Sequence, residues 1–220
     1  ARSEMCIRDR GNSLPMPSFK KLSAATLAAS AILGTVAAPA ASAKSDPVRS
    51  LISPSTCKTI TKLANDGKPV PDPSILHDED SVKPYFQDGV LEYKVVGDFP
   101  YRKQLDAAVA EWNKALDGKA SLKEVKPSEA DDDTVAIIYK PDPNGYVQGA
   151  AYPDHKMVFI KIPNAQYPEA VQGTIAHELG HMMGAGHSCA GALMAGANQN
   201  PISYHVTPLD AAAIIQGQFD

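Results

Sequence analysis

The sequence predicts an α+β domain. Three observations lead to this fold class. Short apolar runs with strand periodicity follow one another between residues 90 and 162, and one amphipathic helix interrupts them after the first run. A histidine-rich helical pattern comes after the last run. Strands and helices in this order are typical of an α+β fold.

Two segments before Lys44 are excluded from the folded domain. Residues 1–15, with Cys6, carry mixed charges and match no targeting pattern, which indicates a non-native leader. Residues 16–43 have the basic start, the alanine-rich apolar stretch and the A-x-A cleavage site (residues 41–43) of a secretory signal peptide. Polar residues interrupt the apolar stretch, which falls short of the ~20 apolar residues of a membrane span. We therefore expect a secreted, extracellular protein without a stable membrane anchor.

The chain that remains after residue 43 is acidic. Its 177 residues are enough for one domain with a sizeable core, and they hold 16 basic and 23 acidic residues, a net charge of −7. An acidic chain without a basic cluster argues against nucleic acid or an anionic membrane surface as a partner. We expect a monomer.

The first part of this chain predicts an extended arm. Residues 44–84 are polar and rich in proline, and only residues 56–65 have the pattern of a short helix. The arm either packs along the folded domain or is a short removable pro-segment, and the sequence leaves both alternatives open. The folded domain itself is expected to span residues 85–220.

The strands and helices of the domain follow in order. Residues 90–96 alternate between apolar and polar, which predicts a half-buried strand, and residues 101–116 have apolar side chains at helical spacing. Proline at the first helical position and an acidic residue soon after it predict two more helices, which begin near Pro168 and Pro208. The helix from Pro168 is expected to bury one apolar stripe, formed by Val171, Ile175, Leu179 and Met182. Further strands are expected at residues 122–125, 134–139, 146–152 and 157–162.

The helix after the last strand carries a cluster of histidines. His177 and His181 are four residues apart, so on a helix they lie on one face, one turn apart, and can bind one ion. Glu178 borders the same cleft, where its carboxylate can reach a water at the metal. His187 follows Gly184, and glycine readily adopts the left-handed conformation that ends a helix and reverses the chain. Three histidines with an open fourth position are the ligand set of a catalytic zinc site.

The stretch from His177 to His187 reads His-Glu-x-x-His-x-x-Gly-x-x-His. It resembles the metzincin zinc endopeptidases, and the chain from about Gly89 onward is most similar to their matrixin-type branch of bacterial secreted proteases. The resemblance implies a zincin-like domain with a mixed, twisted sheet, a helix behind it, a zinc-binding helix and a short C-terminal lobe that ends in a helix. It implies one catalytic Zn²⁺, with the three histidines as its ligands and Glu178 as the general base. It also implies that Met194 lies in a tight turn beneath the zinc.

A second implication of the resemblance concerns the strand expected at residues 146–152. In metzincins this element is an edge strand above the cleft, which pairs with extended substrate backbone. Small side chains let another backbone approach closely, and an edge offers free N–H and C=O groups. The small residues are Gly149, Ala150 and Ala151. The alternative is a simple hairpin arm.

Two cysteines, Cys57 and Cys189, remain after residue 43. In an oxidising compartment such a pair indicates a disulfide, which would brace the rim of the active site. The alternative is a latent form in which the Cys57 thiolate binds the zinc, as the matrixin propeptide cysteine does. The residues around Cys57 lack the Pro-Arg-Cys-Gly-x-Pro-Asp pattern of that switch, so we expect the disulfide.

Other residues with metal-binding side chains lack ligand spacing. Asp131, Asp132 and Asp133 could suggest Ca²⁺, but they form no recognisable calcium loop, so a solvated turn is expected. Three further histidines occur singly and are expected to be surface or loop residues: His77, His155 and His205.

These features predict a secreted zinc-dependent endopeptidase that hydrolyses protein or peptide bonds with a zinc-activated water and Glu178 as general base. One alternative is a metal-bearing, non-catalytic binding module, against which the intact Glu178 argues because ligation needs no base. Another is a zinc amidase that acts on a cell-wall component, although the chain has no cell-wall-binding repeat.

Overall fold

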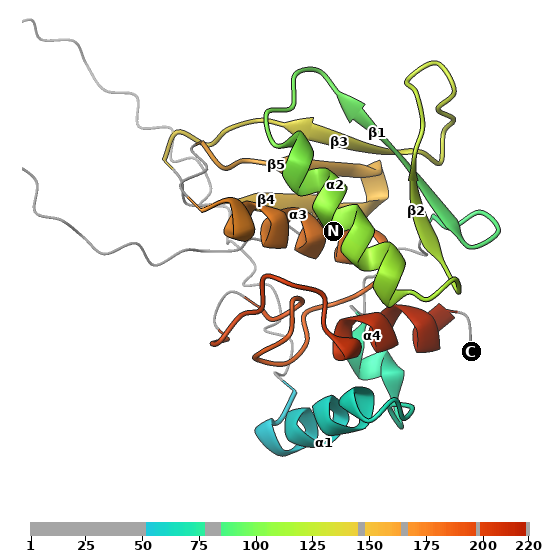
Figure 1. Ribbon diagram of the computed structural model, residues 1–220, viewed down its shortest axis with the longest axis vertical. Helices are drawn as coiled ribbons and strands as arrows, with labels where there is room; N and C mark the ends of the chain where they lie inside the picture. The colour runs from blue at the N-terminus through green and yellow to red at the C-terminus, as the bar shows by residue number, and fades with distance from the viewer. Residues whose placement is uncertain (1–51, 78–84, 145–147, 164–166, 197–198, 219–220) are drawn as a thin grey trace, which may run out of the picture. The chain divides into compact units, whose positions relative to one another are not determined.

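The computed structural model describes residues 52–77, 85–144, 148–163, 167–196 and 199–218 (Figure 1). The expected leader and signal peptide, and the first residues of the expected arm, lie outside the described residues, so these assignments stay predictions. Within the described part of the chain, no helix has both the length and the apolar character to cross a membrane.

Five strands form one mixed sheet in the order β2-β1-β3-β5-β4. Strands β2, β1, β3 and β5 run parallel, whereas β4 is antiparallel to β5 and forms one edge of the sheet. The α+β class and the mixed sheet predicted from the sequence are therefore confirmed. The strands are β1 (Val90–Val96), β2 (Ser121–Glu124), β3 (Val135–Tyr139), β4 (Gly149–Tyr152) and β5 (Met157–Ile160).

Of the α-helices in the described residues, α2 and α3 lie against one face of this sheet (Figure 1). Helix α3 packs on β4, β5 and α2, and α4 packs on α1. The predicted helix starts at Pro168 and Pro208 are confirmed. The helices are α1 (Pro54–Asn65), α2 (Arg102–Ala115), α3 (Pro168–Met182) and α4 (Pro208–Gln218), with short 3-10 helices η1 (Pro73–Leu76) and η2 (Pro153–His155).

Helix α1 begins two residues before the predicted start. Pro54 occupies its first turn, and the Ser53 side chain accepts a hydrogen bond from the Thr56 backbone N–H at 3.1 Å. Proline lacks an N–H, and serine satisfies one of the free donors of a helix start, so both residues favour initiation here.

Trp112 of α2 connects this helix to α3 on the same face of the sheet. Its side chain is fully buried, and the indole Nε1–H donates to the Ala176 carbonyl at 2.8 Å. An aromatic side chain with a satisfied polar atom combines a large buried area with a fixed orientation. Helix α2 therefore holds α3 in place directly behind the histidines.

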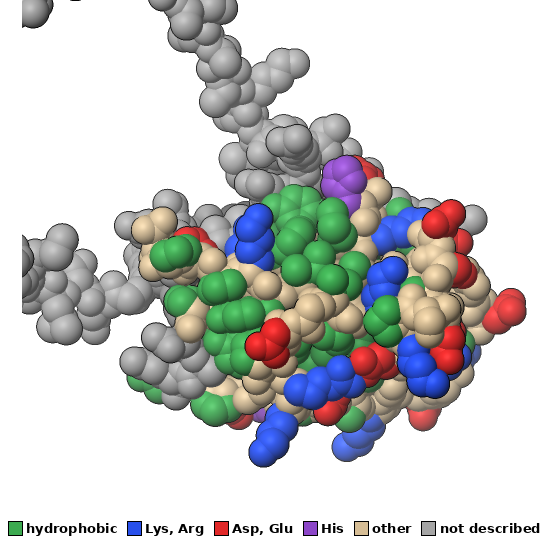
Figure 2. All heavy atoms as spheres, turned by 90° about the horizontal axis from the view of Figure 1, so that it is seen from above, with side chains coloured by type: hydrophobic (Ala, Val, Ile, Leu, Met, Phe, Trp, Pro, Cys, Tyr) green, Lys and Arg blue, Asp and Glu red, His purple; other side chains and the backbone are tan. Residues whose placement is uncertain are grey.

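Charged residues of both signs are interspersed over the described residues of the face seen from above in Figure 2. Hydrophobic side chains gather in the middle of the same face. On this face the lysine and arginine side chains form no continuous area of one sign. The expectation about nucleic acid stays a prediction.

His205, in the segment before α4, forms hydrogen bonds with both α2 and α3. Its Nδ1 lies 2.6 Å from a Glu111 oxygen of α2, and its Nε2 lies 3.0 Å from a Glu169 oxygen of α3. The neighbouring Tyr204 rests on Gly173, where an added Cβ would lie 2.9 Å from the Tyr204 Cα. Hydrogen bonds with the two carboxylates raise the pKa of His205 above its ordinary value of 6.5.

The substitution His205→Gln is expected to lower the melting temperature in acid and to have no effect in alkali. The folded-state pKa of His205 is raised, so its stabilisation is fully present below pH 6.5 and is lost as the pH rises through the folded-state pKa. Because the side chain is half exposed, the effect is less than about 1 kcal/mol. Thermal unfolding at about pH 5.5 and about pH 9 measures it. His155→Gln, at an exposed position, is the control, and an equal loss at both pH values would contradict the prediction.

Candidate metal centre

The three histidines of the motif converge on one point. His177 and His181 project from α3, and His187 comes from the loop that follows it. One ring nitrogen from each lies within 4.8 Å of the other two, and the Nε2 atoms of His177 and His181 are 3.1 Å apart. Gly184, with a φ of 91°, directs the chain back after α3 so that His187 reaches the other two rings.

Backbone carbonyls fix the orientation of two of these rings. The Nδ1 of His177 lies 2.8 Å from the Leu193 oxygen, and the Nδ1 of His181 lies 2.8 Å from the Ala185 oxygen. A carbonyl accepts, so each Nδ1 carries the proton and each Nε2 carries a lone pair. Partners of this kind are typical of metal-binding histidines.

Two lone pairs that face each other at 3.1 Å repel each other, and a cation between them relieves this repulsion. Protonation does not supply it, because burial and the neighbouring histidine lower the pKa of His177 to about 3, and burial lowers that of His181 well below its ordinary value. Tetrahedral zinc with Zn–N bonds of about 2.0–2.1 Å separates its nitrogen ligands by roughly 3.3 Å. The three-imidazole donor set and the spacing of the His177 and His181 nitrogens therefore fit zinc.

Glu178 lies beside the histidines as a buried carboxylate. Its side chain is fully inaccessible to solvent, and neither oxygen has a hydrogen-bond partner among the described residues. Burial raises the pKa of Glu178 to about 8, although the nearby Ala151 backbone and the charge of Lys161 act in the opposite direction. Burying a carboxylate with so few polar contacts among the described residues is costly, which makes Glu178 a candidate functional residue.

The edge strand touches this carboxylate. At Gly149, the first residue of β4, an added Cβ would lie 2.6 Å from a Glu178 oxygen and 2.9 Å from the Thr174 side chain. The three small residues of β4 are buried, and β4 forms one edge of the sheet. Glycine at position 149 therefore makes room for Glu178 between α3 and the edge of the sheet.

Met194 packs against α3 at Gly180, the residue before His181. Its side chain is fully buried, and an added Cβ at Gly180 would overlap its sulfur, so glycine permits the close approach of this segment to α3. The Met194 carbonyl accepts from the Ser188 backbone N–H at 2.7 Å. Ser188 directly follows His187, so this hydrogen bond connects the turn at Leu193 and Met194, which we call the Met194 segment, to the loop that carries His187.

Asp210 fixes the same segment from α4. Its carboxylate accepts from the backbone N–H groups of Leu193 and Met194, each at 3.0 Å, and from the N–H and hydroxyl of Thr207 at 2.8 and 2.6 Å. Burial raises the pKa of Asp210, while these hydrogen bonds lower it. The sequence predicts only an acidic residue in the first turn of a helix here. The two bonds to the Met194 segment were missed, because no local pattern signals them.

Cys57 and Cys189 form a disulfide with an S–S distance of 2.01 Å. The Cys57 sulfur is thus bonded to another cysteine. In this structure it is not a thiolate directed at the histidines. The expected disulfide is therefore present, and the arrangement does not favour the alternative of a latent form with Cys57 bound to the zinc.

Two of the three adjacent aspartates, Asp131 and Asp133, have carboxylates that contact other protein groups. Asp131 accepts hydrogen bonds from Thr134 and from the Asp133 backbone, and Asp133 forms an ion pair with Lys156 at 2.7 Å. Among the described residues, the only group that meets the geometry of a metal site is the histidine triad. A calcium site stays without support.

The single histidines have different environments. His155 is exposed in η2, and His205 bridges two glutamates. His77, expected as a surface or loop residue, is half-buried and forms an antiparallel β-bridge with Ala185, next to the third-ligand loop. The sequence offers no signal for this contact.

Comparison with known proteins gives limited similarity. No family model matches the chain, and no curated protein matches it. One solved structure that matches is a zinc-dependent peptidase from Methanocorpusculum labreanum, with 13% identity and a TM-score of 0.40. The match covers 57% of this chain and 100% of that chain. At this TM-score the similarity assigns no function, so the site geometry has to carry the functional conclusion.

Proposed function

We propose that the protein is a secreted zinc-dependent endopeptidase of the matrixin type. The observation that carries the proposal is the convergence of three imidazoles beside a fully buried carboxylate, whose oxygens have no hydrogen-bond partner of normal geometry among the described residues. A set of three histidines with an open position is characteristic of catalytic rather than structural zinc. When bound, zinc polarises the scissile carbonyl and lowers the pKa of a water to ~7.

The histidines orient the metal site, and Glu178 transfers the proton. The Nδ1 hydrogen bonds of His177 and His181 keep both Nε2 lone pairs directed at the ion. Glu178 takes a proton from the attacking water at a carboxylate oxygen and then gives it to the nitrogen of the leaving amine. Burial of Glu178 excludes bulk water from this transfer and raises the affinity of the carboxylate for the proton.

Strand β4 supports an extended peptide as the substrate. It is an edge strand, it begins at the residue that touches Glu178, and its small side chains allow another backbone to approach. A peptide added as a further strand would place a backbone carbonyl near the histidines. This arrangement favours cleavage within a chain over removal of terminal residues, because an added strand can continue in both directions.

Removal of zinc tests the proposal. The purified protein is expected to contain about one zinc per chain and to hydrolyse casein. Dipicolinate should remove the metal and abolish hydrolysis, and one equivalent of Zn²⁺ should restore it. Elemental analysis and casein hydrolysis measure the two quantities on the same samples.

Three outcomes would contradict the proposal. Hydrolysis that persists without metal would exclude zinc as the cofactor. Zinc binding without hydrolysis of any peptide would favour the binding module. Cleavage of isolated cell-wall fragments, with casein left intact, would favour the amidase.

A further inference from the structure

The N-terminal segment contacts the loop that carries the third histidine. The Gly186 backbone N–H donates to the Leu76 carbonyl at 2.8 Å, and His77 pairs with Ala185 in the β-bridge described above. Leu76 is fully buried, so this contact belongs to the core. Both contacts lie immediately before His187 in the loop.

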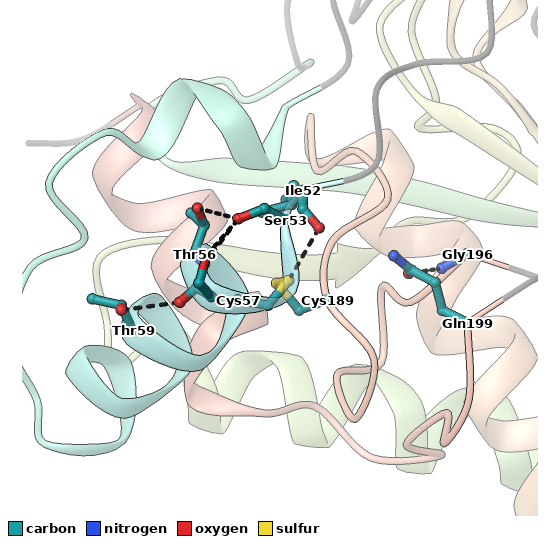
Figure 3. The surroundings of a disulfide bond; sticks show 9 residues. Ile52, Ser53, Thr56, Cys57, Thr59, Cys189, Gly196 and Gln199 are labelled. Atoms are coloured by element: carbon teal, nitrogen blue, oxygen red, sulfur yellow. Dashed lines mark hydrogen bonds between the residues drawn. A yellow bond between two sulfur atoms is a disulfide. The ribbon is translucent and has the colours of Figure 1, made fainter.

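The same segment contacts the loop again, just after His187. Cys57, in the first turn of α1, is bonded to Cys189, two residues beyond the third histidine (Figure 3). Cys189 is 1% exposed. The start of α1 is itself fixed by Ser53, whose hydroxyl caps the helix beside the disulfide (Figure 3). His187 therefore lies between two attachments that come from one stretch of chain.

Helix α4 anchors this stretch in turn. The His77 Nε2 lies 2.8 Å from the Ala213 carbonyl, and an added Cβ at Gly217 would overlap the His77 ring. The Val70 backbone N–H donates to the Gln216 side chain at 2.8 Å. Residues 52–77, which we call the N-terminal brace, are thus held at several points along α4.

The brace also reaches the second ligand. Ala185, the β-bridge partner of His77, supplies the carbonyl that accepts from the His181 Nδ1. A shift of His77 therefore displaces both the acceptor that orients His181 and the loop that carries His187. Partners of this kind change metal affinity when they are altered.

We propose that the N-terminal brace is a permanent positioning element of the metal centre, which fixes the loop on both sides of His187 and sets the affinity of the histidine site for zinc. A fixed loop loses less conformational entropy when its histidine binds the ion. The inference rests on the zinc site of the proposed function, and it assigns residues 52–77 to the active protein rather than to a removable pro-segment.

Zinc affinity of paired variants tests the inference. His77→Ala is expected to raise the zinc dissociation constant roughly 10- to 100-fold. His77→Gln should recover part of this loss, because its amide can donate to the Ala213 carbonyl. The double variant Cys57→Ser, Cys189→Ser should also raise the constant, whereas His155→Ala, at an exposed histidine, should leave it unchanged. Competition with a chelator measures the constant, and the absorption spectrum of the Co²⁺-substituted protein reports the ligand geometry.

A substitution in α4 can displace His77 without changing any residue of the N-terminal brace. Gly217→Ala places a Cβ against the His77 ring while alanine favours the helix, so the fold is retained and zinc affinity should fall. Circular dichroism and thermal unfolding of every metal-free variant establish that it is folded at the temperature of the titration.

The outcomes separate this inference from the proposed function. Unchanged zinc affinity and Co²⁺ spectra in His77→Ala, Gly217→Ala and the double serine variant would overturn it, even if melting temperatures fall. Processing that removes residues 52–77 and leaves zinc affinity unchanged would overturn it as well. A wild-type protein that binds zinc and cleaves no peptide overturns the proposed function alone, because the affinity comparison still decides the role of the brace. A protein that binds no zinc overturns both.

Discussion

Glu178→Gln is expected to lower casein turnover by roughly 10²- to 10⁴-fold while zinc content stays the same. Glutamine has nearly the same shape, so the packing against β4 is retained, but its amide cannot accept and return the proton. The three ligands are untouched, and the site still binds one ion. The variant thus separates the metal site from the chemistry performed there.

Glu169→Gln is the matched control for this experiment. It makes the same chemical change on the same helix, at a side chain that is 67% exposed and contacts His205 rather than the metal centre. Its turnover and zinc content should equal those of the wild type. Full activity in Glu178→Gln would remove Glu178 from the mechanism and with it the main support for an enzyme.

A substitution that moves the Glu178 carboxylate but keeps the residue should also lower casein turnover, by less than Glu178→Gln does. In Gly149→Ala the new Cβ would lie 2.6 Å from a Glu178 oxygen and 2.8 Å from its Cγ, so the carboxylate has to move. Turnover should fall with zinc content unchanged. Gly196→Ala is the control, because its Cβ would lie at least 3.5 Å from His187, an ordinary contact distance. Equal turnover in both variants would show that the position of Glu178 is not critical.

The parts of the site that could be predicted are those encoded in local spacing. The spacing of four positions from His177 to His181 puts both on one face of any helix, and Gly184 signals where that helix ends. The strands and helices were predicted to within a few residues for the same reason, because the periodicity of apolar residues is local. Each of these signals lies within about one or two helical turns of sequence.

Burial of α3 was predicted only in part. The apolar stripe of Val171, Ile175, Leu179 and Met182 is buried as expected, but the opposite face is buried too, with His177 at 1% and Glu178 at 0% exposure. Apolar periodicity detects a helix with one buried face. It does not detect a polar face that is covered by β4 and by the Met194 segment.

The long-range polar contacts had no sequence signal. Leu76 meets Gly186 through backbone atoms, which leave no trace in side-chain identity. An acidic residue is common in the first turn of a helix, so Asp210 needed no other explanation in the sequence. Its hydrogen bonds from Leu193 and Met194 were therefore not predicted. Buried polar groups that join distant segments depend on the complete fold.

Asp210→Ala is expected to lower the free energy of unfolding by at least about 3 kcal/mol, the largest stability effect that we expect from one substitution. The carboxylate is 1% exposed and accepts four hydrogen bonds. Its removal leaves the backbone N–H groups of Leu193, Met194 and Thr207 without their acceptor. Asp210→Asn should recover little, because the amide NH₂ would face an N–H donor.

Urea unfolding of the metal-free protein measures this loss, with Asp106→Ala as the control. Asp106 forms an ion pair with Arg102 at 3.1 Å but is 58% exposed, so its removal should cost less than about 1 kcal/mol. Because the Leu193 carbonyl orients His177, the Asp210 variant should also bind zinc more weakly, and Asp106→Ala should not. A loss for Asp210→Ala no larger than that of the control would mean that the Met194 segment is held by packing alone. In that case the turn at Leu193 and Met194 would not depend on α4.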